Sequence, residues 1–326
     1  MNFFNLFKKL TKEPLVRLLV TIIILLSIFL YIRSFEQSSI PLEGFQNSQA
    51  ILTAVPIVIL SLSLHGTSWF LILKALGVST SFIESNYLYF TSLLARYIPG
   101  NLWHIGFRTI MGQERGINSD ISMLGITLEL GFTVVTGAVI TITGAITSKI
   151  IIQQKFFNLI LWILALGLTI GLAVAVFAKL REDKMSIQIE KSTSLISIVK
   201  QALNRLRKFP KGLLIAIILL FLTAWIFQGL AFFLIVNAWK TVPESFLLVF
   251  IPVYAAGWLI GFLNPLTPSG IGTREAIFLG TLPSLISPTV VLSSSMLMRL
   301  TGLIAELALT TVYWIILRVS KKQKGY

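Results

Sequence analysis

The 326-residue sequence contains no cysteine, only two histidines and few charged residues. The absence of cysteine excludes disulfides, thiolate nucleophiles and Cys-ligated metals, and two histidines are too few for a histidine-rich metal site. Charged residues make up 12% of the chain, whereas a soluble domain carries about 25%. The sequence also lacks a nucleotide-binding glycine loop, a paired-Asp glycosyltransferase motif and a Ser/His/Asp constellation. We therefore predict no cofactor, no metal and no enzymatic activity.

Long apolar runs dominate what is present, since 55% of the residues are hydrophobic. This composition predicts an all-α, polytopic integral membrane protein. The formal net charge of +14 is concentrated in residues 1–17, 179–212 and 318–326, each of which adjoins an apolar run. That placement follows the positive-inside rule and favours anionic lipid headgroups over nucleic acid as a partner. We expect both termini on the cytoplasmic side of the plasma (inner) membrane.

The apolar runs predict a single membrane domain, residues 1–326, with six full spans. The predicted spans are residues 15–32, 50–76, 121–147, 157–178, 212–238 and 288–317. The first half of the domain is residues 1–178 and the second half is residues 213–326. Between the halves, apolar and basic residues of the 179–212 segment recur at helical spacing, which predicts an amphipathic helix on the cytoplasmic membrane surface. The alternative for this segment is a binding platform for a partner.

A stretch rich in proline and glycine interrupts the apolar sequence of the second half. Its helix-disfavouring residues are Pro265, Pro268, Gly270 and Gly272. No straight helix is expected to continue through them, and Arg274 and Glu275 follow directly. Irregular backbone at membrane depth is tolerated only where it is buried in protein or lines a wet cavity. The alternative is a short external loop, which would leave unusually short flanking helices.

A similar interruption lies in the first half, where the apolar run 87–94 meets a Pro-Gly pair and continues into a segment with arginine. Its candidate site residues are Arg96, Tyr97, Pro99, Gly100, Trp103, His104 and Arg108. Corresponding interruptions in the two halves of a membrane protein indicate a transporter's binding site. His65 lies in the preceding span, and we interpret it as a packed, hydrogen-bonded residue.

The lengths of the broken segments predict two re-entrant helical hairpins. The limbs of the first hairpin, 84–113, are each shorter than the ~20 residues that a span needs. Six full spans place both termini inside only if the second hairpin, 246–285, enters from the opposite face. Two hairpins of opposite sense, each followed by a long span, form an inverted repeat. We expect every limb to be too short to cross and both tips to meet at one polar chamber.

The spans that follow the hairpins share a Gly-x-x-x-Glu pattern, which supports the repeat. Gly125 precedes Glu129 in one span, and Gly302 precedes Glu306 in the other. With Arg96, Arg108 and Arg274, these two glutamates are the side chains expected to line the chamber.

Four arginines are expected near or inside the membrane: Arg96, Arg108, Arg274 and Arg299. A guanidinium group donates a fork of hydrogen bonds that matches phosphate, and helix N-termini at the breaks add backbone donors. The glutamates Glu129, Glu275 and Glu306 are candidates for pairing with these arginines, contacting a cationic headgroup or carrying protons. The set predicts a lipid headgroup as ligand. The alternative is that each Arg and Glu only pairs with a neighbour to hold helices together.

The two interruptions resemble the flippase-like membrane domain of lysylphosphatidylglycerol synthases, the multiple peptide resistance factor family. An Arg-Tyr-hydrophobic-Pro-Gly run followed by Trp matches Arg96 to Trp103, and a Pro-x-x-Pro-x-Gly-hydrophobic-Gly-x-Arg-Glu run matches Pro265 to Glu275. The family pattern often has Gly-Gly where this chain has Ser269 and Gly270. The resemblance implies a domain that moves or holds a lipid across the bilayer. The aminoacyl-transferring domain of the full synthase has no counterpart here.

Together these observations predict a translocator of a phospholipid or a polyprenyl-phosphate-linked glycan. The alternative is an integral membrane component of a lipid or polyprenyl-phosphate glycosylation pathway, either as the enzyme or as the anchor of a soluble glycosyltransferase. A second copy of this chain, in a homo-oligomer, is a further candidate partner.

Overall fold

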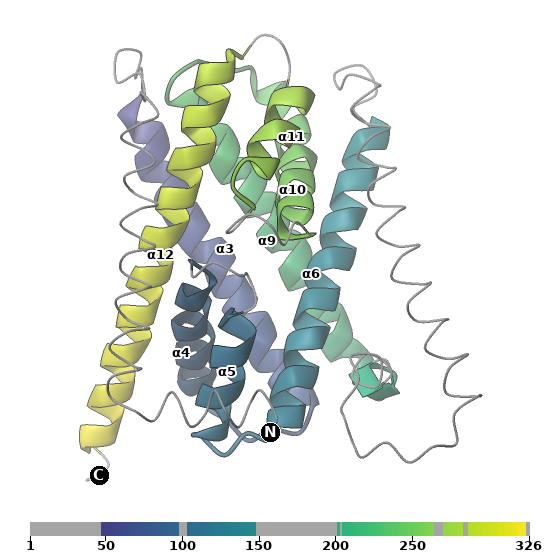
Figure 1. Ribbon diagram of the computed structural model, residues 1–326, viewed down its shortest axis with the longest axis vertical. Coiled ribbons are helices and arrows are strands. Elements are labelled where there is room, and N and C mark those ends of the chain that lie inside the picture. The colour runs from purple at the N-terminus through teal and green to yellow at the C-terminus, as the bar shows by residue number, and fades with distance from the viewer. Residues whose placement is uncertain are drawn as a thin grey trace.

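The computed structural model describes residues 47–97, 103–147, 201–202, 204–263, 270–282 and 286–323, and its elements in these ranges are all helical (Figure 1). Four helices are long: α3 (Ser48–Ala75), α6 (Ser119–Thr147), α9 (Lys211–Asn237) and α12 (Pro288–Gln323). The shorter ones are α4 (Phe82–Leu93), α5 (Trp103–Gln113), α10 (Leu247–Leu263) and α11 (Thr273–Thr281), with 3-10 turns at Leu94–Tyr97 and Glu244–Phe246.

Five helical stretches in the described ranges are long and apolar enough to cross a membrane: Ser48–Ala75, Ser119–Thr147, Lys211–Asn237, Glu244–Phe262 and Pro288–Ser320. Four of them coincide with predicted spans, so the protein is an integral membrane protein of helices. The predicted spans 15–32 and 157–178 lie outside the described residues.

The fifth stretch corrects one expectation about the second hairpin. We expected each of its limbs to be too short to cross, but Glu244–Phe262 has 19 residues and qualifies by length and composition. Pro252 lies inside α10 without ending it, as neighbouring helices permit in membrane proteins. The helix therefore continues until Leu263. The other limb, α11, has only 9 residues.

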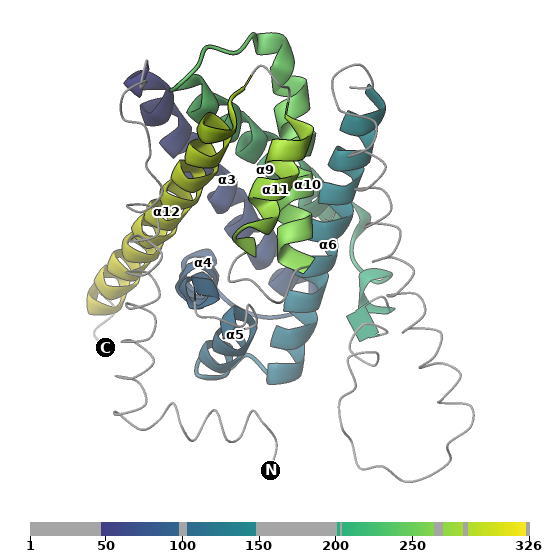
Figure 2. The same ribbon diagram turned by 45° about the horizontal axis from the view of Figure 1, so that its top comes forward.

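The two pairs of shorter helices lie at opposite ends of the bundle (Figures 1 and 2). In both views α4 and α5 lie in the lower part and α10 and α11 in the upper part, and in Figure 1 α6 and α12 run alongside both pairs. α4 has 12 residues and α5 has 11, so each is roughly 16–18 Å long, well short of a ~30 Å hydrocarbon core.

Close approaches and internal hydrogen bonds hold the long helices together. A β-carbon at Gly144 of α6 would overlap the ring of Pro252 on α10, so these helices meet at the glycine. Ser61 of α3 donates to the carbonyl of Ala224 on α9 at 3.0 Å, and the Trp225 indole donates to the Thr136 hydroxyl at 3.2 Å. Small residues and polar side chains commonly join membrane helices in this way.

The outward faces of the long helices are apolar, with exposed side chains such as Leu52, Val135, Ile215 and Ile304. Most of the 179–212 segment lies outside the described residues, and of its predicted surface helix only residues 201–202 and 204–206 are described, as helical. Near its end, Ala202 and Phe209 are buried in an apolar cluster with residues of α3, α6 and α9.

Candidate ligand-binding cavity

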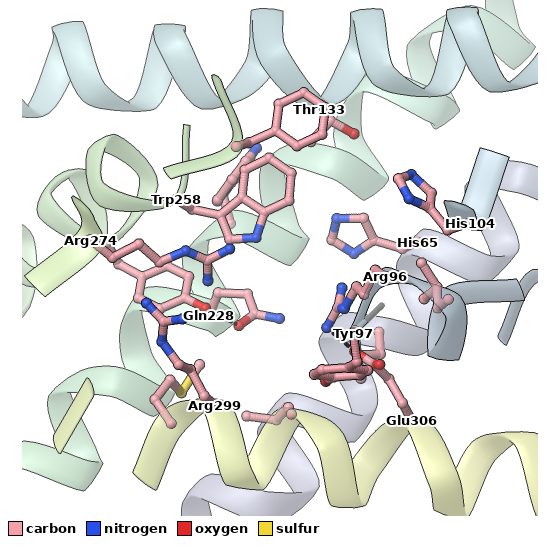
Figure 3. Close-up of a pocket in the computed structure, with 18 of the residues that line it drawn as sticks. His65, Arg96, Tyr97, His104, Thr133, Gln228, Trp258, Arg274, Arg299 and Glu306 are labelled. Carbon is pink, nitrogen blue, oxygen red and sulfur yellow. Dashed lines mark hydrogen bonds and ion pairs between the residues drawn. The ribbon is translucent and has the colours of Figure 1, made fainter. Parts of the chain in front are cut away.

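One cavity brings together side chains from both broken stretches (Figure 3). It encloses about 1340 Å³, including the part open to solvent. The charged side chains on its wall are Arg96, Arg108, Arg274, Arg299, Glu129 and Glu306. In Figure 3, Arg274 and Arg299 face this space from one side, and Arg96, Tyr97 and His104 face it from the other. The five side chains expected to share a chamber therefore do share one.

Arg108 of α5 is held firmly on the cavity wall. Its guanidinium pairs with Glu129 of α6, and its Nε donates to the Ser92 hydroxyl at 2.9 Å. The same group lies over the rings of Trp69 and Tyr89, with centroid distances of 4.8 and 4.4 Å. Only 1% of the Arg108 side chain is exposed. These contacts tie the first pair of short helices to α6.

Arg96 pairs with Glu306 of α12, so this ion pair joins the two halves of the chain. The Glu306 side chain is fully buried, whereas 26% of the Arg96 side chain remains exposed. The pairing does not follow the sequence repeat. By analogy with Arg108 and Glu129, the repeat would pair Glu306 with Arg274.

Glu275 anchors the second broken stretch to α12. It pairs with Arg299 at 2.8 and 3.0 Å and accepts a 2.5 Å hydrogen bond from the Ser295 hydroxyl. Glu275 also accepts a hydrogen bond from the backbone N–H of Gly272 at 2.8 Å, which caps the start of α11. Arg299 also donates to the carbonyl of Gly270 at 3.2 Å.

Close contact between two glycines directs Arg274 into the cavity. Gly270 has φ +71°, and a β-carbon there would lie 2.7 Å from the Cα of Gly261 on α10. A β-carbon on Gly261 would in turn lie 2.8 Å from Cγ of Arg274. Glycine at position 270 permits the positive φ, and glycines at positions 261 and 270 together permit the close approach of the two backbones. The Arg274 side chain can therefore cross α10 and reach the cavity.

Arg274 differs from the other cavity arginines. Within the described ranges it has no carboxylate partner. Its buried Nε makes no hydrogen bond, as is also true of the Arg96 Nε. The guanidinium carbon of Arg274 lies 5.7 Å from the centre of the Trp258 ring. Because Arg274 is partly buried, solvent screens its charge less than that of a surface arginine, and it attracts an anion more strongly.

The remaining predicted residues contribute in different ways. Tyr97 and His104 line the cavity. Gly270, Gly272 and Glu275 shape the backbone that presents Arg274 rather than lining the space, and Trp103 begins α5. Four predicted site residues lie outside the described residues: Pro99, Gly100, Pro265 and Pro268.

Several uncharged polar residues on the wall were not predicted. Gln228 accepts a 3.0 Å hydrogen bond from the Tyr254 hydroxyl, and Thr133 lines the opposite side. His65 forms the expected hydrogen bond, from Nδ1 to the carbonyl of Ser61 at 3.0 Å, but it also lines the cavity. The sequence feature that could have identified these residues is that they are polar positions within otherwise apolar spans.

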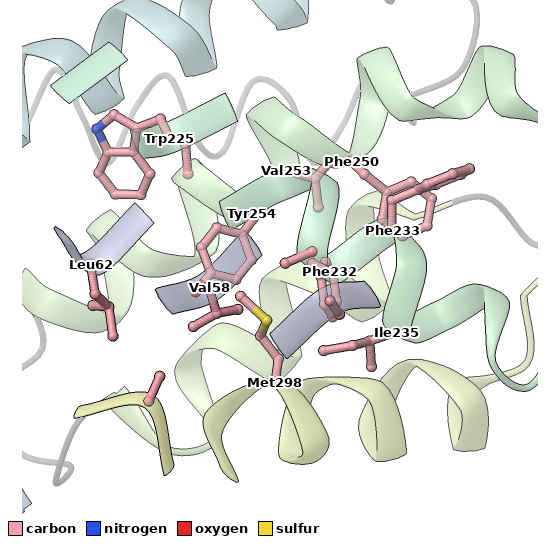
Figure 4. Close-up of a cluster of buried hydrophobic side chains, with 14 of the residues drawn as sticks. Val58, Leu62, Trp225, Phe232, Phe233, Ile235, Phe250, Val253, Tyr254 and Met298 are labelled. Carbon is pink, nitrogen blue, oxygen red and sulfur yellow. The ribbon is translucent and has the colours of Figure 1, made fainter. Parts of the chain in front are cut away.

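The rest of the wall is apolar and continues into the core of the bundle. Figure 4 shows Val58, Leu62, Trp225, Tyr254 and Met298, all of which line the cavity, beside core residues such as Phe232 and Phe250. A wall with a cationic part and an apolar part suits an amphipathic ligand. No group of three or more His, Asp or Glu side chains in the described residues could hold a metal ion.

Comparison with known proteins gives one match. The family profile described as lysylphosphatidylglycerol synthase TM region matches residues 15–309. Neither the curated proteins nor the solved structures include a significant match.

Proposed function

The chain belongs to the family of the lysylphosphatidylglycerol synthase transmembrane region, and on that premise we propose that it translocates a phospholipid or a lipid-linked glycan. Arg274 binds the phosphate of the headgroup, while the acyl or prenyl chain stays against the apolar wall. Membership of the family supports a membrane protein with a lipid-related function. The specific activity, translocation of a lipid bound at Arg274, is what the proposal adds.

The observation that carries this proposal is Arg274, a cavity arginine with no carboxylate partner among the described residues. A guanidinium group presents two parallel N–H donors to a phosphate. The partly exposed Arg96 faces the same space from the other side of the cavity. A phosphate between them would receive donors contributed by both broken stretches.

The placement of the short helices supports movement across the bilayer. We propose that α4–α5 and α10–α11 are the two re-entrant hairpins of an inverted repeat, entering from opposite faces with both chain termini in the cytoplasm. A site between such hairpins lies near the midplane. Rocking of one hairpin against the other would open the cavity to each leaflet in turn.

Purified full-length protein in vesicles tests the function directly. Fluorescent phospholipids with labelled acyl chains should change leaflet without covalent change, as measured by quenching from the outside. Arg274→Lys keeps the charge but loses the paired donors, so exchange should fall about tenfold, a loss of roughly 1.4 kcal/mol. Arg274→Ala should lower it further.

The other outcomes contradict the proposal in distinct ways. Wild-type exchange rates in both variants would make Arg274 structural. A labelled lipid that is glycosylated in the presence of a sugar donor would indicate an enzyme. An inert protein that retains a soluble glycosyltransferase would indicate an anchor.

A further inference from the structure

Among the described residues, three carboxylates lie on the cavity wall or pair with an arginine of that wall, and all three have arginine partners. Glu129 pairs with Arg108, Glu306 with Arg96, and Glu275 with Arg299. Glu275 also accepts from the Ser295 hydroxyl and from the backbone of Gly272. An ammonium group that enters the cavity therefore meets carboxylates whose charge is already compensated.

The arginines outnumber these carboxylates by one. Four guanidinium groups line the cavity, and across the described residues Arg274 is the one without a carboxylate partner. The two histidines, His65 and His104, are also on the wall, and protonating either would only add positive charge. Counted over the described residues, the cavity thus carries at least one net positive charge.

We infer that the cavity selects headgroups with one net negative charge, meaning a phosphodiester whose second substituent is an uncharged polyol such as glycerol or a sugar. This inference rests on the proposed function and adds the class of substrate. An uncompensated charge in an apolar environment is costly. A monoanionic headgroup removes that cost, whereas a cationic headgroup adds to it.

A zwitterionic headgroup is disfavoured for a related reason. Its phosphate compensates Arg274, but its ammonium brings the net charge back to +1 with no free carboxylate to receive it. The uncharged polar groups on the wall suit hydroxyls instead. The Gln228 amide nitrogen can donate, because only its oxygen is used by Tyr254, and the Thr133 hydroxyl can accept, because its hydrogen is donated to the Glu129 carbonyl at 2.9 Å.

Competition binding in neutral detergent tests the selection without a membrane surface potential. Acyl-labelled phosphatidylglycerol is bound to the purified full chain and displaced by unlabelled phosphatidylglycerol, phosphatidylethanolamine or phosphatidylcholine. We expect phosphatidylglycerol to displace the probe at about tenfold lower concentration than either zwitterion, the effect of one unfavourable charge.

Three variants assign the preference to Arg274. Arg274→Gln should reduce the preference to about one. Arg274→Lys should bind more weakly yet keep the preference, because the charge remains. Arg318→Gln is the matched control, since Arg318 lies at the exposed end of α12 over Trp314 and outside the cavity. It removes the same charge and should keep the tenfold preference.

If the zwitterionic lipids displaced the probe as well as phosphatidylglycerol or better, the charge selection would be wrong. The proposed function would still stand if the probe bound and moved between leaflets. Loss of the preference in Arg318→Gln would place its origin outside the cavity and overturn the charge selection as well. Glycerophosphoglycerol is the headgroup without acyl chains. If it competed as well as the lipid, the assignment of a lipid as the ligand would be wrong. A protein that neither binds nor moves any of these lipids would overturn the proposed function itself.

Discussion

At the scale of single residues, the cavity arginines divide into three that pair with a carboxylate and Arg274, which has no such partner among the described residues. Arg108 is buried and contacts Glu129, Ser92 and two aromatic rings. We expect Glu129→Ala to lower the free energy of unfolding by about 3–5 kcal/mol, because it leaves a buried guanidinium unpaired. Thermal unfolding in detergent, followed by circular dichroism, measures the loss.

The double variant Arg108→Met/Glu129→Leu is the control for this prediction. Replacing both charges with apolar side chains of similar size removes the unpaired charge, so most of the lost stability should return. A double variant less stable than Glu129→Ala would show that the aromatic contacts of Arg108, rather than its ion pair, stabilise α5.

At the scale of secondary structure elements, the crossing of α10 and α11 depends on Gly270. We expect Gly270→Ala to destabilise the fold by about 1–3 kcal/mol, because alanine is strained at φ +71° and its β-carbon meets Gly261. The displaced α11 would carry Arg274 with it, so phospholipid binding should fall together with the melting temperature.

Gly272 provides a matched comparison for Gly270. It also has a positive φ, +82°, but a β-carbon there would meet no atom within 4 Å. Gly272→Ala should therefore show the conformational cost alone and a smaller loss of lipid binding. Equal losses in the two variants would mean that the contact with Gly261 does not position Arg274.

At the scale of the whole molecule, the proposed inverted arrangement predicts which side of the membrane each segment faces. The cysteine-free sequence allows single cysteines at Ser38, Lys191 and Gln323. We expect an impermeant maleimide to label position 38 from outside the cell and positions 191 and 323 only after permeabilisation. Labelling of position 191 from outside would contradict opposed hairpins and the alternating access built on them.

Composition and hydrophobic runs were enough to predict the class of protein and four of the spans in the described ranges. These features follow from local properties, since an apolar run of sufficient length forms a membrane helix wherever it lies. The ends of these helices also follow from the local sequence. Helix α4 gives way to a 3-10 turn at Leu94–Tyr97, close to the Pro-Gly pair, and α10 ends at Leu263, before Pro265. The extent of α10 was misjudged, because neighbouring helices allow Pro252 to stay inside it.

The partners of the charges were decided only by the tertiary structure. The sequence repeat suggests equivalent roles for Arg108 and Arg274, yet the fold pairs Arg108 with Glu129 and leaves Arg274 without a carboxylate in the described residues. Glu306 is 210 positions from its partner Arg96, and an ion pair depends on distance in space rather than on spacing along the chain. Side-chain identity thus determined that guanidinium groups were present in the apolar segments, and helix packing determined which of them lacks a carboxylate partner among the described residues.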